Sequence, residues 1–71
     1  MSGLDLAGLG YDAQRAAAVR LLAAGERLTT DELAVELGVS PSRAGDILRE
    51  LYSDGRIDRA GRPFRYFVPA S

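Results

Sequence analysis

The chain has 71 residues, a formal net charge of −1, and neither cysteine nor histidine. This length allows one domain with one modest hydrophobic core, and the missing residue types exclude disulfides and thiolate or imidazole metal sites. Because histidine is also the commonest general base and the chain is short for enclosing a substrate pocket, we expect no enzyme activity, no metal and no cofactor.

No apolar stretch approaches the roughly 20 residues that cross a bilayer, and residues 1–10 lack the basic start and apolar run of a secretion signal. We therefore expect no membrane partner and a cytoplasmic location. Residues 1–10 contain three glycines without a helical or strand period, which favours a flexible lead-in. Leu4, Leu6 and Leu9 are its candidates for folding back onto the core. Residues 11–71 are predicted to form the domain.

The first predicted helix covers residues 12–24. Asp12 is a favourable N-cap, the alanine-rich segment that follows favours helix, and Gly25 is expected to end it. At 100° per residue, Arg20 lies opposite the apolar face. That face consists of Ala18, Val19, Leu21 and Leu22.

A second helix is predicted over residues 30–37. Thr29 stands three residues before Glu32, the spacing of a capping box, in which the threonine oxygen accepts the Glu32 amide and the glutamate accepts the Thr29 amide. Leu28 and Leu33 occupy the two positions of a hydrophobic staple around this cap. The sequence therefore marks the start of this helix twice.

A tight turn separates this helix from a third, predicted over residues 41–52. Gly38 is expected in the left-handed conformation that ends a helix, and apolar Val39 follows it. Ser40 is an N-cap, and Pro41 sits at the first helical position, where its missing N–H costs nothing. The apolar face of the third helix consists of Ala44, Ile47, Leu48 and Leu51.

After this helix the apolar period becomes that of extended chain. Residues 56–59 and 64–68 are predicted as two short strands joined by the turn at 60–63, and Pro69 ends the second strand. The order is helix, helix, tight turn, helix, hairpin. This order predicts a mainly α domain with a small antiparallel β-hairpin.

Residues 29–52 carry the helix-turn-helix pattern. Small Ala34 lets the two helices cross closely, Gly38 supplies a positive φ, and Val39 fills the corner. On these residues, the segment 29–71 resembles the winged-helix superfamily of DNA-binding domains, and 16–22 resembles its first helix. The resemblance implies a winged helix-turn-helix fold, a three-helix bundle plus a wing, that binds DNA.

Within that superfamily, SRAGDILRELYSDGRI at 42–57 is similar to the γ domain of FtsK/SpoIIIE-type DNA translocases, as is the Tyr-Asp pair at 11–12. That family opens its recognition helix with Asn-Arg-Ala-Ala and its wing with Gly-Ile. Ser42 and Asp46 depart from the pattern, standing where Asn and Arg are expected, and the wing is shorter. The resemblance implies a domain that reads short directional sequences for a DNA pump. A transcription regulator or a small plasmid or phage protein fits the residues as well.

The charges are distributed unevenly along the chain. Residues 1–39 have a net charge of −3, whereas residues 40–71 carry six arginines against four acids, a net charge of +2. Exposed charges act within a Debye length of about 8–10 Å, so a locally positive half can bind phosphate despite the overall charge. We expect the C-terminal arginines to gather on one exposed surface.

The third helix is the predicted recognition helix, lying in the major groove. Arg43 is the candidate for a base-edge contact, bidentate to a guanine, while Ser40 and Ser42 at the positive helix end suit a phosphate. The residues opposite the apolar face are Ser42, Asp46, Arg49 and Ser53, with Arg43, Gly45 and Glu50 at the flanks.

Three residues of this helix have two interpretations each. Gly45 allows either close approach of the backbone to DNA or crowding between helices. Asp46, like Glu50, repels phosphates, although a carboxylate can accept from cytosine N4. Arg49 either contacts DNA or forms a solvated ion pair with a neighbouring acid.

The hairpin is the second candidate contact. Gly61 and Pro63 shape an exposed tip that directs Arg62 outward, where it could enter a minor groove. Arg59 and Arg65 are then candidates for the flanking phosphates. The alternative is a charged edge that keeps the sheet from pairing with other chains.

Three aromatic side chains follow the hairpin tip. Their strand spacing predicts that they are core and close the sheet over the helices. The alternative is a stacking platform for single-stranded nucleic acid. They are Phe64, Tyr66 and Phe67.

Together these patterns predict sequence-specific binding of double-stranded DNA, with residues 41–52 in the major groove and residues 56–68 at the minor groove or backbone. The alternative is a protein-interaction module on the same fold. The overall charge favours it, as do Glu32, Val35 and Glu36, expected on the outside of the second helix. No dimerising helix is visible, so the isolated domain is expected to be monomeric, with other domains of a larger parent as further partners.

Overall fold

Three helices and a two-stranded hairpin follow one another in the order the sequence predicts. The computed structural model describes residues 8–69, so Leu4 and Leu6 of the predicted lead-in lie outside the described residues. Leu9 is 52% exposed and does not fold onto the core. The elements are α1 (Tyr11–Ala23), α2 (Thr30–Leu37), α3 (Pro41–Ser53), β1 (Asp58–Ala60) and β2 (Arg65–Phe67).

Helix α1 begins one residue earlier than predicted. Its N-cap is Gly10, in an extended conformation, and Asp12 lies in the first turn. The prediction of Asp12 as N-cap is therefore wrong. Tyr11 packs against the core, which gives the helix an apolar contact at its first residue, and Asp12 still places a negative charge at the positive end of the helix dipole.

Helices α2 and α3 have the ends that their sequences predict. The Glu32 amide donates to Thr29 Oγ1 over 3.1 Å, and the Thr29 amide donates to Glu32 Oε1 over 3.0 Å. Gly38 ends α2 in the left-handed conformation with a φ of 68°. Ser40 then caps α3 by accepting the Arg43 amide over 3.1 Å. These local hydrogen bonds set the short turn between the two helices.

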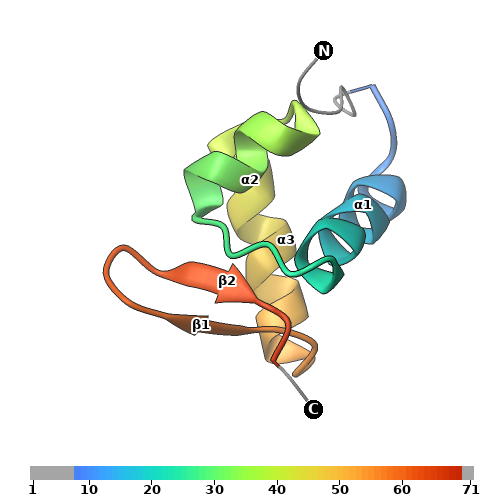
Figure 1. The fold of residues 1–71 in the computed structure, drawn as a ribbon. Helices are drawn as coiled ribbons and strands as arrows, with labels where there is room; N and C mark the ends of the chain where they lie inside the picture. Colours follow the sequence, from blue (N-terminus) through green and yellow to red (C-terminus); the bar gives the residue numbers. More distant parts are fainter. Residues whose placement is uncertain (1–7, 70–71) are drawn as a thin grey trace.

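The core lies where the three helices meet. Figure 1 shows α3 behind α1, α2 and the hairpin, so that one side of α3 is covered and the other is open. The predicted apolar face of α3 is its buried face, and full burial of an Ile or Leu side chain contributes about 1.5–3 kcal/mol. The α3 residues in the core are Ala44, Ile47, Leu48 and Leu51.

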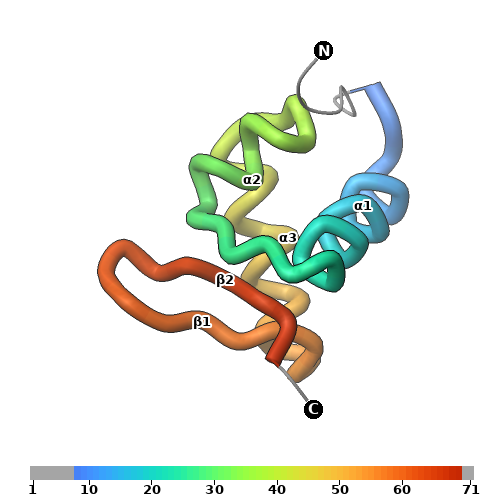
Figure 2. The backbone as a smooth tube through the Cα atoms, in the orientation of Figure 1, coloured from blue at the N-terminus to red at the C-terminus, as the bar shows by residue number. Residues whose placement is uncertain are grey.

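The hairpin is shorter than predicted and is tied to the chain between α1 and α2. β1 and β2 are antiparallel. Leu28 bridges Tyr66 through two backbone hydrogen bonds, of 3.1 and 2.8 Å, and Figure 2 shows this connecting segment running beside β2. An isolated two-stranded hairpin is only marginally stable. The bridge to Leu28 adds a third extended segment and holds the hairpin against the helices.

The aromatic residues of the hairpin are only partly core. Tyr66 packs against the buried cluster, as predicted. Phe67 is half-buried, and Phe64 is 39% exposed. The prediction of a core position is wrong for Phe64, because this residue lies before β2, at the end of the hairpin that projects from the helices.

Candidate nucleic-acid interface

The outer face of α3 is open to solvent along its length. The side chains opposite the core are exposed, as the helical period predicts, and no other element covers them within residues 8–69. The N-terminal end of the helix meets α1, and its C-terminal end meets the hairpin. The exposed side chains of this face are Ser42, Asp46, Arg49 and Ser53.

The acidic side chains of α3 and its C-cap are each paired with an arginine. Asp46 Oδ1 lies 3.4 Å from Arg49 Nη1, so the ion-pair interpretation of Arg49 holds in this structure. Arg15 of α1 spans two further acids, with Nε at 2.6 Å from Glu50 Oε1 and Nη2 at 2.9 Å from Asp54 Oδ2. Each of these three acids is therefore in contact with an arginine, although two arginines against three acids leave a local charge of −1.

Arg43 is held at the start of α3 by an aromatic contact. Its guanidinium carbon lies 5.3 Å from the centre of the Tyr11 ring, and the Tyr11 hydroxyl donates to the Asp46 carbonyl over 3.4 Å. Burial, followed by the nearby charge of Glu50, raises the pKa of Tyr11 above 10.0, which keeps this donor protonated at neutral pH. Arg43 has no acidic partner among the described residues.

A shallow hollow opens beside this arginine. It has a cavity volume of about 180 Å³ and is lined by Gln14, Val39, Ser40 and Arg43. The Ser40 hydroxyl oxygen already accepts the Arg43 amide as the helix cap. The predicted phosphate contact Ser40 and the predicted base contact Arg43 therefore line the same hollow. Ser42, directly after Pro41, is exposed but does not line it.

The hairpin arginines do not share one face. The register pairs Arg59 with Tyr66 and Ala60 with Arg65, and side chains alternate between the faces of a strand. Arg65 therefore points away from Arg59. Its Nη1 donates to Glu32 Oε1 over 2.6 Å and to the Arg27 carbonyl over 3.2 Å. The expectation that the C-terminal arginines gather on one exposed surface is therefore wrong, because the α2 carboxylate holds Arg65 on the hairpin face opposite Arg59, and Arg49 is paired with Asp46 on α3.

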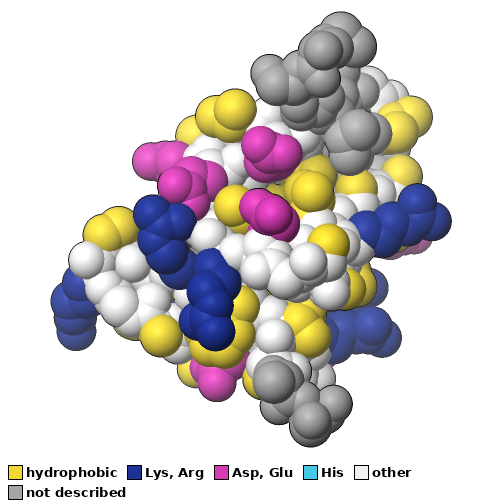
Figure 3. Space-filling model, in the orientation of Figure 1, with side chains coloured by type: hydrophobic (Ala, Val, Ile, Leu, Met, Phe, Trp, Pro, Cys, Tyr) yellow, Lys and Arg dark blue, Asp and Glu magenta, His cyan; other side chains and the backbone are white. Residues whose placement is uncertain are grey.

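Acidic and basic side chains lie next to each other on the side of the molecule where Arg65 meets Glu32. Figure 3 shows acidic side chains over α2 and basic side chains next to them over the hairpin, with separate basic side chains at the outer end of the hairpin and beside α1. In addition to Arg65, Arg27 belongs to this region, and its guanidinium lies 4.3 Å from the centre of the Phe67 ring. The basic groups are thus spread along the molecule.

Arg59 and Arg62 lie at the other face and the tip of the hairpin. The Arg59 guanidinium carbon is 4.3 Å from the centre of the Tyr52 ring and 4.4 Å from that of Phe64. Hydrogen bonding to Tyr66 raises the pKa of Arg59, so it stays charged. Arg62 is exposed, 5.9 Å from the Phe64 ring. Neither arginine has an acidic partner in the part of the chain that the structure describes.

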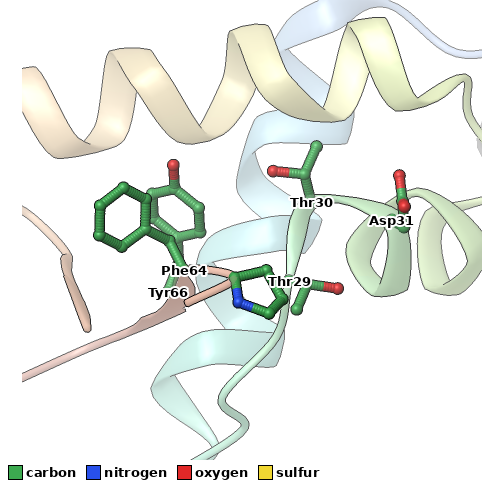
Figure 4. Close-up of a pocket in the computed structure, with 6 residues that line it drawn as sticks. Thr29, Thr30, Asp31, Phe64 and Tyr66 are labelled. Atoms are coloured by element: carbon green, nitrogen blue, oxygen red, sulfur yellow. The ribbon is translucent and has the colours of Figure 1, made fainter. Parts of the chain in front are cut away.

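A groove separates the hairpin tip from the first turn of α2. Its volume is about 240 Å³, and in Figure 4 Phe64 and Tyr66 stand across from Thr30, below the ribbon of α3. Thr30 lies next to Gly45 of α3. A Cβ atom added to Gly45 would lie 3.7 Å from Cγ2 of Thr30. That distance is ordinary contact, so helix crowding does not explain Gly45. The lining residues are Thr29, Thr30, Asp31, Pro63, Phe64 and Tyr66.

Sequence reasoning missed three residues of this region: Tyr11, Arg15 and Tyr52. Arg15 meets acids 35 and 39 positions away, and no local spacing reveals such a pair. Tyr11 stands out in the sequence only through the family resemblance, which does not indicate its contact with Arg43. Tyr52 could have been found from the sequence. It is an aromatic residue at the end of an amphipathic helix but not on the apolar face of that helix, which indicates a contact with another element.

The sequence matches no protein-family model and no curated protein. Within residues 8–69, none of the helices combines the length and hydrophobicity needed to cross a membrane. The case for a function therefore depends on the geometry of α3 and the hairpin.

Proposed function

We infer that this domain binds double-stranded DNA as a winged helix, with α3 in the major groove and the hairpin beside it as the wing. The observation that carries the proposal is the pairing of charges. The acids of α3 are each in contact with an arginine, whereas Arg43 and Arg62 have no acidic partner among the residues described. These two arginines can therefore take up phosphate or base contacts without breaking an ion pair.

The fold supports this proposal in two ways. Helices α2 and α3 are joined by the short turn at Gly38 that the helix-turn-helix pattern requires, and α3 leaves its outer face open. The hairpin is tied to the connection between α1 and α2 through the Leu28–Tyr66 bridge and contacts the last turn of α3 through Arg59 and Tyr52. A helix open along one side, with a rigid hairpin at one end, has the shape needed to follow a groove and the adjacent backbone.

Arg43 and Arg62 have different roles in this proposal. Arg43, in the first turn of α3, is the base-reading residue, and a bidentate contact to guanine provides about 1–3 kcal/mol of discrimination. Arg62 contacts the minor groove, whose negative potential attracts a guanidinium group. The domain acts as a regulator or as the DNA-reading domain of a translocase.

Fluorescence anisotropy with a random-sequence duplex tests the proposal. At low salt we expect binding, which weakens with a log–log salt slope of about −2, because each neutralised phosphate contributes about −0.9 and the proposal has two free arginines, Arg43 and Arg62. Arg62→Ala should weaken binding to every sequence. Arg43→Ala should relax the preference at one base pair, measured by selecting bound duplexes from a random pool. Arg20→Ala is the matched control, since Arg20 is exposed on α1 and the charge change is the same.

A protein-interaction module is the second candidate, and one observation favours it. Val35 is 75% exposed on the outside of α2, between Asp31 and Glu36. Glu32, expected on the same surface, is instead engaged by Arg65. If the wild-type protein fails to bind duplex DNA even at low salt, or if all three arginine variants bind equally well, the DNA proposal is wrong and this surface becomes the leading candidate.

A further inference from the structure

Arg59 joins three parts of the fold that are separate in the sequence. Its guanidinium carbon lies 4.3 Å from the ring centre of Tyr52, in the last turn of α3, and 4.4 Å from the ring centre of Phe64, in the turn just before β2. Arg59 itself belongs to β1. One planar cation therefore contacts two aromatic rings, one from the recognition helix and one from the hairpin.

Neither ring belongs to the buried core. Tyr52 and Phe64 are both 39% exposed, and each lies against the guanidinium group of Arg59. Such a cation–π contact contributes about 0.5–1 kcal/mol at an exposed site.

The opposite face of the hairpin has its own attachment. There Arg65 binds Glu32 of α2 over 2.6 Å, and the backbone of Tyr66 pairs with Leu28. These contacts hold the hairpin to α2 and to the connection before it. Among the described residues, the Tyr52–Arg59 contact is the one side-chain cation–π contact that joins the hairpin to α3.

We propose that Tyr52, Arg59 and Phe64 form a clip that sets the angle between the hairpin and α3, with Arg59 as a positioning residue and not a phosphate contact. This inference rests on the proposed DNA binding. Arg62 lies three residues from Arg59 along the hairpin, so its direction depends on the clip. Tyr52 and Phe64, which carry no charge, thereby become determinants of DNA affinity.

The first test needs no DNA. Hydrogen exchange of the hairpin amides is compared between the wild type, Tyr52→Ala and Tyr52→Phe. Loss of the clip should speed exchange at the Tyr66 amide and its neighbours in Tyr52→Ala, whereas Tyr52→Phe keeps the ring, loses only the hydroxyl contact with Arg59, and should exchange far more slowly than Tyr52→Ala. The amides of α2 should be unchanged in both variants, which shows that the fold is intact. Unchanged hairpin exchange in Tyr52→Ala would overturn the clip.

The second test separates positioning from phosphate contact. Tyr52→Ala and Arg59→Ala should each weaken duplex binding by about 2- to 5-fold, the equivalent of one exposed cation–π contact. The double variant should be no weaker than Arg59→Ala, because both changes remove the same contact. The salt slope should stay at the wild-type value in all three.

Arg59 is a phosphate contact, and the proposal is wrong, if Arg59→Ala reduces the salt slope by about 0.9 while Tyr52→Ala has no effect on affinity. If the wild type does not bind duplex DNA, the proposed function fails and Arg59 has no role in DNA binding. The hydrogen-exchange result then still decides whether the clip orients the hairpin.

Discussion

Arg65 and Glu32 meet through an oxygen that already has another donor. Arg65 Nη1 lies 2.6 Å from Glu32 Oε1, and the same oxygen accepts the Thr29 amide over 3.0 Å. One carboxylate therefore closes the capping box of α2 and holds β2 against it. An arginine that the sequence suggests for a phosphate is instead part of the fold, and the start of α2 is coupled to the position of the hairpin.

This coupling makes the stability depend on pH. The Thr29 amide, followed by the Arg65 side chain, lowers the pKa of Glu32 below 4.5. A carboxylate with a lowered pKa in the folded state stabilises the fold above its unfolded-state pKa, and this contribution is lost as the pH falls through the folded-state value. We expect the thermal midpoint to fall between roughly pH 5 and pH 3, and to fall less in Glu32→Gln. Melting curves at a series of pH values check this, and parallel curves for the two proteins would contradict it.

The contribution of the Thr29 cap to stability can be measured separately from that of the Arg65–Glu32 ion pair. Thr29→Ala removes the hydroxyl that accepts the Glu32 amide and should lower the free energy of unfolding by about 1 kcal/mol, the usual loss for an N-cap. Thr29→Ser keeps the acceptor and should restore most of it. Ser42→Ala, an exposed serine that caps no helix, is the control. Urea unfolding measures all three, and an equal loss in Ser42→Ala would show that the cap is not the cause.

The parts of the fold that the sequence predicts well depend on short-range contacts. The capping box spans three residues, the Ser40 cap also spans three, and the buried face of α3 follows directly from the helical period. In each case the partner is a near neighbour in the chain. The pattern of residue types therefore carries the information that determines the local structure.

The candidate site is predicted less well because its contacts are long-range. Arg65 finds Glu32 33 positions away, and Arg15 finds Asp54 39 positions away. The sequence contains several acids that could pair with each arginine. Only the fold determines which of them lies within contact distance. The predicted N-cap Asp12 fails for a similar reason. Tyr11 packs against the core, so α1 begins at Tyr11 and Asp12 lies inside its first turn.

Gly45 offers a test in which stability and function should move in opposite directions. A Cβ atom at this position meets only Thr30 Cγ2, at 3.7 Å, so alanine fits. Since glycine in mid-helix costs roughly 1 kcal/mol relative to alanine, Gly45→Ala should raise the free energy of unfolding by about that amount. If the backbone approaches DNA closely here, the same variant should bind duplex DNA more weakly. Unchanged or tighter binding would show that close approach is not the reason for this glycine.

Arg15 provides the sharpest test of charge balance on α3. Its side chain is 25% exposed and bridges Glu50 and Asp54. Arg15→Gln would leave both carboxylates without their partner, close to the proposed DNA surface. Two like charges at about 8 Å in water cost about 0.5 kcal/mol for each pair. We therefore expect binding to the random duplex to weaken by about 2- to 5-fold.

The control removes the two acids as well. In Arg15→Gln combined with Glu50→Gln and Asp54→Asn, neither of these two carboxylates is left to repel phosphate, so affinity should return at least to the wild-type value even though Arg15 is absent. Arg20→Ala, on the same helix, should leave affinity unchanged in either background. Thermal melts of each variant confirm that the fold is kept. If the triple variant binds as weakly as Arg15→Gln alone, Arg15 contacts the DNA itself, and the balancing of the α3 acids is not what permits binding.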